Sequence, residues 1–253
     1  MTFLRDTGLI FWAQLRTELR NPVWVVIGVA QPILYLVLFG PLVKGIAPAL
    51  GANADPWQIL TPALIIQIAL FGSLFAGFGI VAELRFGVVE RQRVTPAARG
   101  ALLLGRVLKD MVTLVAQALL LVALAVVTFG LRVNALGMVL SVLLIAVMGA
   151  GLAAASYALG LWAKAESTLA SVLNSVAVPV MLLSGILLPM SVGPTWLQNI
   201  AKANPFSHTV DAARALFRGD FGASEVYVGT TVTLVVSLVL MVIGARGFAR
   251  ENA

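Results

Sequence analysis

The sequence contains no cysteine, a single histidine and few charged residues, and each scarcity excludes a class of protein or site. Without cysteine, a disulfide scaffold, a thiolate zinc or iron–sulfur centre and a cysteine nucleophile are all excluded. The single histidine, His208, excludes a histidine-rich metal site. Charged residues make up 11% of the 253 residues and hydrophobic residues 60%, whereas soluble domains have about 25% and about 45–50%. This composition excludes an ordinary soluble domain and a disordered chain, and it predicts an integral membrane protein.

Six uncharged stretches are long enough to cross a bilayer, because a spanning helix needs roughly 20 apolar residues. They are Asn21–Val43, Pro56–Ala82, Met111–Leu131, Val133–Ala163, Ser167–Ala201 and Val226–Ala245. Arg132 alone separates the third and fourth stretches, which predicts a tight turn between antiparallel helices. Pro189 and Pro194 divide the fifth stretch into a helix ending near Leu188 and a polar segment. We therefore expect an all-α membrane protein with six transmembrane helices, forming a single domain over residues 1–253.

The basic residues are distributed unequally between the two sides of this arrangement. If the N-terminus is inside, most of the 17 lysines and arginines also lie inside. Inner segments of membrane proteins are enriched in these residues, so we expect both termini to be cytoplasmic. The net charge of +6 would suggest nucleic-acid binding in a soluble protein, but here an anionic cytoplasmic membrane surface is the better explanation.

The N-terminal segment 1–20 has a moderate helical periodicity of its own. Its apolar side contains Leu4, Phe11, Leu15 and Leu19, with Trp12 at the edge, and its basic side contains Arg5, Arg16 and Arg20. Phe3, Ile10 and Glu18 interrupt the pattern. The pattern predicts an interfacial helix on the inner leaflet, and Pro22 is expected to begin the next helix at the membrane boundary.

The inner segment Glu83–Asp110 holds many of the charges. A solvated charged loop would explain them. The helix-like stretch Glu83–Arg93, which precedes the break at Thr95-Pro96, instead favours a structured element that docks a partner.

The outer segment, residues 193–222, is also not expected to span the membrane. Pro194–Ala203 could form one short helix, with Trp196 at the interface. Ser207 is a suitable N-cap for a second helix, His208–Arg218, which Gly219 would end. Asp211 and Arg214 could pair at i,i+3 on it. We expect both helices to sit at the outer leaflet or to dip into it.

Three candidate sites have simpler explanations. Gly100–Gly105 has the spacing of a phosphate loop, but Arg106 stands where that motif requires lysine. Ser184 and His208 could form an intramembrane protease pair, but no further signature supports them. Gly149-Ala150-Gly151 indicates close helix packing, because small residues allow backbones to approach.

The centres of the predicted spans contain no Asp, Glu or His, which argues against an ion-driven carrier. The polar residues at depth are Gln31, Gln67, Gln117, Asn174 and Tyr157. They could form hydrogen bonds between helices, or they could line a weakly polar path for an amphiphilic substrate. If no ion gradient supplies the energy, a partner must, and the charged inner segment is where it would bind.

Two motifs point to a family. One is Glu83-x3-Gly87-x2-Glu90-Arg91, followed by Thr95-Pro96-x2-Arg99 and Leu102–Leu108; the other is Asn204-Pro205-Phe206-x-His208-x2-Asp211-Ala212-x-Arg214. Together with Arg20-Asn21-Pro22, they resemble ABC-2 type permeases, the membrane subunits of bacterial ATP-binding-cassette exporters. The branch is similar to the daunorubicin-resistance permeases.

The resemblance implies an assembly and a set of roles. The permease would be a multi-pass protein of the bacterial inner membrane and would form a dimer with a second copy or a paralogue. It would bind two ABC ATPase subunits, on which ATP and magnesium would be held, so this chain would be a transport subunit, not an enzyme, and would hold no cofactor or metal. The substrate would be an amphiphilic or hydrophobic drug or lipid. A polysaccharide or lipid-linked glycan permease and a stand-alone carrier remain alternatives.

The resemblance also implies four groups of functional residues. The connecting helix would include Arg5, Phe11, Trp12, Arg16 and Arg20. The ATPase-coupling element, within residues 83–100, would include Glu83, Arg85, Gly87, Glu90, Arg91, Arg93, Thr95, Pro96 and Arg99. The substrate path between protomers would include Gln31, Tyr35, Gln67, Phe71, Asn174 and Met181. The outer re-entrant hairpin, residues 193–222, would include Trp196, Asn204, Pro205, His208, Asp211 and Arg214. Glu90 and Arg91 are the foremost docking candidates, because a docking surface needs complementary charge.

Overall fold

The computed structural model describes residues 2–21, 23–46, 55–93, 98–187, 190 and 193–251, and across these ranges the long elements are all helices. They are α1 (Thr2–Leu19), α2 (Val23–Ile46), α3 (Pro56–Arg85), α4 (Val88–Arg93), α5 (Arg99–Phe129), α6 (Ala135–Ala163), α7 (Glu166–Leu182), α8 (Thr195–Lys202), α9 (Pro205–Arg218) and α10 (Ser224–Glu251). The predicted all-α fold is confirmed. Pro22, Thr95 and Pro96, each singled out from the sequence, lie outside the described residues.

Five of the six predicted spans correspond to helices that are long and apolar enough to cross a membrane: α2, α3, α5, α6 and α10. The remaining stretch forms α7, an apolar helix of 17 residues. It ends at Leu182, earlier than the predicted end near Leu188. The chain turns there because Gly185 adopts a left-handed conformation, with φ of 76°, which a glycine allows without strain.

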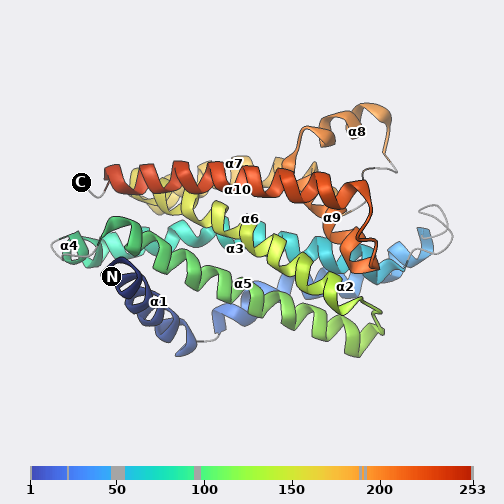
Figure 1. Cartoon of the computed structure of the whole chain (residues 1–253), viewed down its shortest axis with the longest axis horizontal. Helices are drawn as coiled ribbons and strands as arrows, with labels where there is room; N and C mark the ends of the chain where they lie inside the picture. Colours follow the sequence, from blue (N-terminus) through green and yellow to red (C-terminus); the bar gives the residue numbers. More distant parts are fainter. Residues whose placement is uncertain are drawn as a thin grey trace.

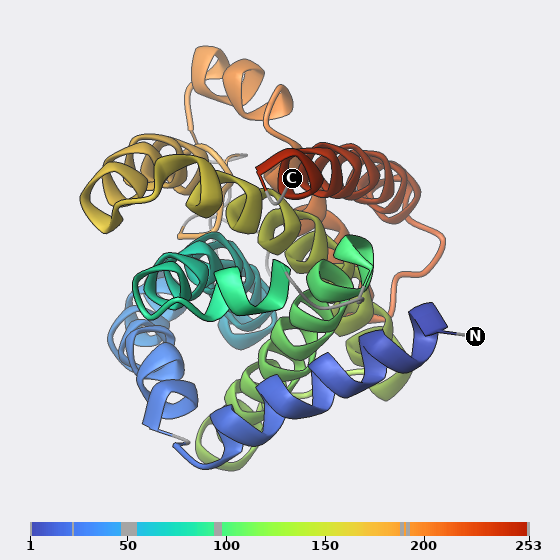
Figure 2. The same cartoon turned by 90° about the vertical axis from the view of Figure 1, so that its left-hand side faces the viewer.

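The long helices form an elongated bundle (Figure 1). The helix α4, the start of α1 and the end of α10 lie together at one end, which we call the α4 end. The helices α8 and α9 lie toward the opposite end, which we call the α9 end. In the view along the bundle, α1 crosses obliquely over α5 (Figure 2).

The centre of the bundle is a contact between α3 and α6 in which backbone meets backbone. A Cβ atom at Gly77 would lie 2.5 Å from the carbonyl oxygen of Ser156, and one at Gly160 would lie 2.6 Å from the carbonyl oxygen of Gly77. The Ser156 hydroxyl accepts a hydrogen bond from the Gly77 N–H at 3.0 Å and donates one to the Leu74 carbonyl. These small residues therefore set the spacing of the two central helices.

The small residues that the sequence analysis assigned to packing do pack closely. A Cβ atom at Gly149 would collide with side-chain atoms of Leu114 and Ser73, and one at Gly151 would collide with the backbone of Ser237. The packing interpretation of Gly149-Ala150-Gly151 is confirmed. The polar residue Gln117 likewise forms an interhelical hydrogen bond, donating to the Val25 carbonyl of α2 at 3.2 Å.

The turn between α5 and α6 is also as predicted. Gly130 is left-handed with φ of 67°, and the Asn134 side chain caps α6 by accepting a hydrogen bond from the Gly137 N–H. The turn is joined to the start of α3, since Gln58 donates to the Arg132 carbonyl at 2.6 Å and Trp57 stacks on Phe129.

The helix that contains the third predicted span begins well before that span. The helix α5 begins at Arg99, so Arg106, Lys109 and Asp110 belong to a continuous helix and not to a charged loop. The helix can continue through these charges because each has a partner: Arg106 pairs with Glu83, and Lys109 pairs with Glu18 and Asp110. Pairing is the usual condition for charges inside a membrane-protein bundle.

Candidate functional site

The candidate docking element is α4, which lies at the end of the bundle. Gly87, with φ of 66°, turns the chain from α3 into it. Val89 is buried against a cluster that includes Ile80 and Leu103, whereas Glu90 and Arg91 are exposed. The helix thus has one apolar anchor toward the bundle and two opposite charges facing away from it.

The other residues predicted for this element have different surroundings. Arg85 forms an ion pair with Glu166 at 3.0 Å, joining the end of α3 to the start of α7. Arg99 donates a hydrogen bond to the Ala249 carbonyl of α10 at 2.9 Å. Arg93 is the last residue of α4, and its side chain lies outside the described part of the structure. These contacts join the end of α3 to the start of α7, and the start of α5 to the end of α10.

The helix α1 turns polar side chains toward the bundle. Gln14 donates to a Glu83 oxygen of α3 at 3.0 Å, and Glu18 pairs with Lys109 of α5 at 3.2 Å. The outward side carries exposed apolar residues, among them Leu4, Trp12 and Leu19. The basic residues Arg5, Arg16 and Arg20 are exposed as well, and Phe11 is half-buried. Glu18, which interrupts the amphipathic pattern in sequence, is part of the packing face.

Arg106 lies at the centre of the contacts beneath α4. Its side chain is only 2% exposed. The same terminal nitrogen lies 2.6 Å from a Glu83 oxygen of α3 and 2.7 Å from the Gln92 side-chain oxygen of α4. Its guanidinium also lies 6.0 Å from the centroid of the Tyr157 ring of α6, within the range of a cation–π contact.

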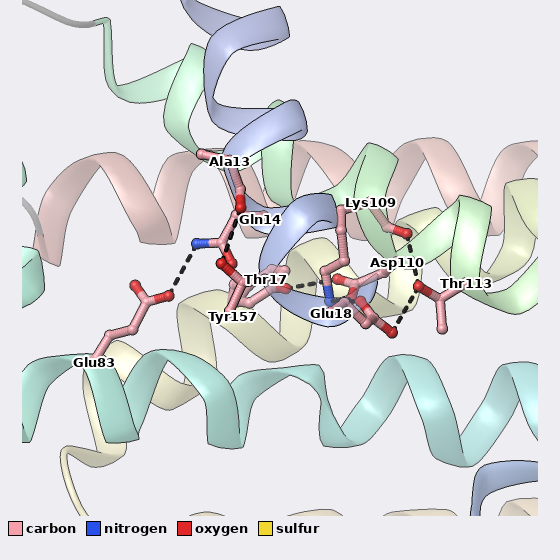
Figure 3. Close-up of polar contacts among 9 residues, drawn as sticks. All are labelled: Ala13, Gln14, Thr17, Glu18, Glu83, Lys109, Asp110, Thr113 and Tyr157. Carbon is pink, nitrogen blue, oxygen red and sulfur yellow. Dashed lines mark hydrogen bonds and ion pairs between the residues drawn. The ribbon is translucent and has the colours of Figure 1, made fainter. Parts of the chain in front are cut away.

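A second set of contacts continues from Tyr157 (Figure 3). The Tyr157 hydroxyl donates to Asp110 at 2.6 Å, and Asp110 pairs with Lys109 at 2.5 Å. Glu18 of α1 pairs with Lys109 and accepts a hydrogen bond from the Thr113 hydroxyl at 2.9 Å. Arg106 and Tyr157 are buried, and the other residues of the set are half-buried. We call the whole set the polar network; its members are Gln14, Glu18, Glu83, Gln92, Arg106, Lys109, Asp110, Thr113 and Tyr157.

Sequence reasoning assigned a functional role in the docking element only to Glu83 among these residues. For Tyr157 it offered an interhelical hydrogen bond or a place on the substrate path, and the bond to Asp110 of α5 confirms the first. The missed signal is the spacing of Arg106, Lys109 and Asp110, which places three charges on one side of a helix at i, i+3 and i+4. The sequence analysis favoured a structured element over residues 83–93 and did not examine the spacing of these three charges.

The opposite end of the bundle contains a buried arginine. Arg214 of α9 donates from Nε to the Ile59 carbonyl of α3 at 3.1 Å and from a terminal nitrogen to the Gly185 carbonyl at 2.8 Å. Its predicted partner Asp211 is 3.9 Å away. Burial lowers the pKa of the Arg214 guanidinium to about 10, so it remains cationic at neutral pH. Burial also raises the pKa of Asp211.

The predicted N-cap of α9 was wrong, while its other features are as expected. The helix begins at Pro205, and Asn204 caps it by accepting a hydrogen bond from the Phe206 N–H at 3.0 Å. Proline is favoured at the first helical position, where its missing N–H costs nothing, and this shifts the start upstream of Ser207. Gly219 ends the helix with φ of 86°, as predicted.

The remaining residues of the predicted outer hairpin lie around α8 and α9. The Asn204 amide donates to the Val180 carbonyl of α7 at 2.8 Å, and a His208 ring nitrogen lies 2.9 Å from the Lys202 carbonyl. Trp196 on α8 is exposed. The helix α9 is thus tied to α3 and to the end of α7.

The predicted path residues lie on α2, α3 and α7, and α2 and α7 both pack on α3. Gln31 is exposed and donates to the hydroxyl of Tyr35, which is half-buried, at 3.1 Å. Asn174 is exposed and bonds to the Ala170 carbonyl of its own helix. Gln67 is only 1% exposed and lies inside the core. Phe71 and Met181 are half-buried on α3 and α7.

The family model described as ABC-2 type transporter matches residues 5–217, which include both motifs. The chain belongs to the ABC-2 type transporter family. It is 26% identical over 250 residues to the daunorubicin resistance ABC transporter permease protein DrrB1 of Streptomyces coeruleorubidus, covering 96% of this chain and 85% of the relative. It is 24% identical over 231 residues to the protein named "Probable doxorubicin resistance ABC transporter permease protein DrrC" of Mycobacterium tuberculosis, covering 90% of this chain and 83% of the relative.

The two motifs lie at opposite ends of the bundle (Figure 1). The first motif covers the end of α3, α4 and the start of α5, which are the elements joined by Arg106. The second motif forms α9, which Arg214 fixes to α3. The chain is therefore a multi-pass membrane permease of a family whose relatives include subunits of drug-resistance transporters.

Proposed function

We propose that this ABC-2 permease is the membrane subunit of an ATP-driven exporter that moves an amphiphilic or hydrophobic molecule, a drug or a lipid, out of a bacterial cell. The supporting observation is α4, which exposes Glu90 and Arg91 while Val89 and Gln92 hold it to the bundle. A charged surface on an anchored helix suits docking of a second protein with complementary charge. The full names of DrrB1 and DrrC mention daunorubicin and doxorubicin, which supports a drug-like substrate.

The proposed assembly contains two permeases, identical or paralogous, and two ABC ATPase subunits, which bind ATP and magnesium. This chain itself holds no cofactor. The substrate path lies between the protomers and is lined by α2, α3 and α7, with α7 as the sixth span. The polar groups of Gln31, Tyr35 and Asn174, which are not enclosed in the core of one protomer, support this placement.

The proposed mechanism is a population shift. ATP closes the two ATPases, and the movement displaces α4 and the helix ends attached to it. The dimer then changes from an inward-favouring to an outward-favouring arrangement, or it compresses the cavity between the protomers. Transport is driven only if the substrate binds the two arrangements differently.

We place the α4 end at the cytoplasmic side of the inner membrane. The helix α1 then lies along the inner leaflet, with Leu4, Trp12 and Leu19 in contact with lipid and its arginines near anionic headgroups. The helices α8 and α9 form a short re-entrant hairpin at the outer side.

The decisive experiment is co-purification of the full-length permease, in mild detergent, with the ATPase encoded beside it. We expect a complex of two permeases and two ATPases whose ATP hydrolysis depends on the permease. A folded, monodisperse permease that binds no ATPase would contradict the proposal and favour a stand-alone carrier.

The topology can be tested with reporters in whole cells. A reporter fused after Ala253 should read as cytoplasmic, because the end of α10 lies at the α4 end. A second reporter, inserted in the turn between Gly130 and Asn134, should read as external. If both report the same side, the assigned number of crossings is wrong.

A further inference from the structure

Arg106 joins two helices through a single nitrogen atom. That nitrogen forms an ion pair with Glu83 of α3 at 2.6 Å and donates a hydrogen bond to the Gln92 side-chain oxygen of α4 at 2.7 Å. A guanidinium suits this bridging role because its donors have a fixed, planar geometry. Arg106 therefore links α4 to α3, in addition to the apolar contacts of Val89.

The link continues from α3 to α1. Glu83 uses one carboxylate oxygen for Arg106 and the other for the Gln14 amide. It also continues to α6, because Arg106 faces the Tyr157 ring, whose hydroxyl bonds to Asp110. From Asp110 the contacts return through Lys109 to Glu18 of α1. The helix α1 is thus held at two points, Gln14 and Glu18.

We propose that Arg106 is a positioning residue that makes α4, α3, α1 and α6 move together, so that a displacement of α4 reaches α1 through Glu83 and Gln14. This inference rests on the proposed function for its role in transport. The mechanical link itself is a property of the permease alone and can be measured without any ATPase.

A purely structural role predicts a different outcome from a positioning role. Replacing a buried ion pair with apolar residues of similar volume is often neutral or stabilising, whereas removing one partner alone is costly. Replacing both Arg106 and Glu83 with methionine should therefore preserve the thermal stability of the fold while removing the link between α4 and α1. If Arg106 and Glu83 served only to stabilise the fold, thermal stability and the link between α4 and α1 would be lost together or kept together.

The test measures hydrogen exchange of the full-length permease in lipid nanodiscs. In the double variant Arg106→Met with Glu83→Met, amides of both α4 and α1 should exchange at least about tenfold faster, because local opening loses the hydrogen bonds that join these helices. The α9 peptides should be unchanged. Arg218→Met is the matched control, since Arg218 is an exposed arginine paired only with Asp220 among the described contacts.

Two further variants separate the effect on α1 from the effect on α4. Gln14→Leu removes the α1 end of it and should speed exchange in α1 but not in α4, since the Arg106–Gln92 bond is intact. Arg106→Lys keeps the cation for Glu83 and should restore part of the protection of α1. The proposal is overturned if the double variant speeds exchange in α4 alone, or in neither helix.

Transport adds an independent readout once the ATPase is in hand. The double variant should hydrolyse ATP with a lower ratio of molecules transported to ATP consumed, and Arg106→Lys should recover part of that ratio. If the wild-type permease bound no ATPase, the proposed function would be contradicted. The hydrogen-exchange test of the link between α4 and α1 would still be valid. An unchanged ratio in the double variant would overturn the role of Arg106 in transport.

Discussion

Gly77→Val is expected to destabilise the bundle more than any other single change considered for this chain. A Cβ at Gly77 would lie 2.5 Å from the backbone oxygen of Ser156, and a backbone atom cannot swing aside as a side chain can. The two central helices would have to separate, which would also weaken the hydrogen bond between Gly77 N–H and the Ser156 hydroxyl. We expect a cost of about 3 kcal/mol or more, at the upper end of overpacking, and a fall in Tm of roughly 6–12 °C.

The measurement is the thermal midpoint of the detergent-solubilised permease, followed by size-exclusion chromatography after heating. Gly72→Val is the matched control, because Gly72 lies on the same helix with no other atom within 4 Å of an added Cβ. It should change the midpoint little. Equal losses in the two variants would mean that α3 does not tolerate valine for a reason other than its contact with α6.

The double charge reversal Glu90→Arg with Arg91→Glu is expected to uncouple transport from ATP hydrolysis. Both side chains are exposed on α4, so the variant should fold and insert normally. A partner surface that complements Glu90 and Arg91 would meet a like charge at both positions in the variant. Such like-charge contacts strongly weaken binding between the two proteins. We expect transport per ATP to fall about tenfold or more, corresponding to a loss of roughly 1.4 kcal/mol or more at the interface.

For this variant, substrate transport and ATP hydrolysis are measured on the same proteoliposomes. The control is the double reversal Arg218→Asp with Asp220→Arg, which exchanges an exposed ion pair near the end of α9 and far along the chain from α4. Normal coupling in the Glu90/Arg91 variant would remove α4 as the docking surface. If both reversals lowered coupling equally, the effect would not be specific to the α4 end.

Much of the fold could be predicted because membranes impose simple length and charge rules. Uncharged stretches of about 20 residues correctly predicted the positions of α2, α3, α5, α6 and α10. Gly130 and Gly219 correctly predicted the ends of α5 and α9. The N-cap of α9 was predicted wrongly because the sequence offers two suitable capping residues. Asn204 and Ser207 are both good caps, and the choice between them is decided by Pro205, which starts the helix directly after Asn204.

The polar network could not be predicted because its partners are far apart in sequence. Arg106, Lys109 and Asp110 appear unfavourable in a spanning helix until Glu83, Glu18 and Tyr157 are brought beside them. Glu18 and Thr113 are 95 residues apart, and Gln14 and Glu83 are 69 apart. A pattern on one helix indicates that a charge needs a partner, but only the packing of the helices identifies it.

The polar inward face of α1 has a consequence for the order of events during synthesis. The helix α1 is synthesised before α3 and α5, which carry the groups that bind Gln14 and Glu18. An isolated α1 has no polar partner to satisfy these two side chains except water. Its leucines and Trp12 can meanwhile rest on the membrane surface. The polar contacts of α1 can therefore form only after α3 and α5 have been synthesised, so the docking of α1 follows the assembly of these later helices.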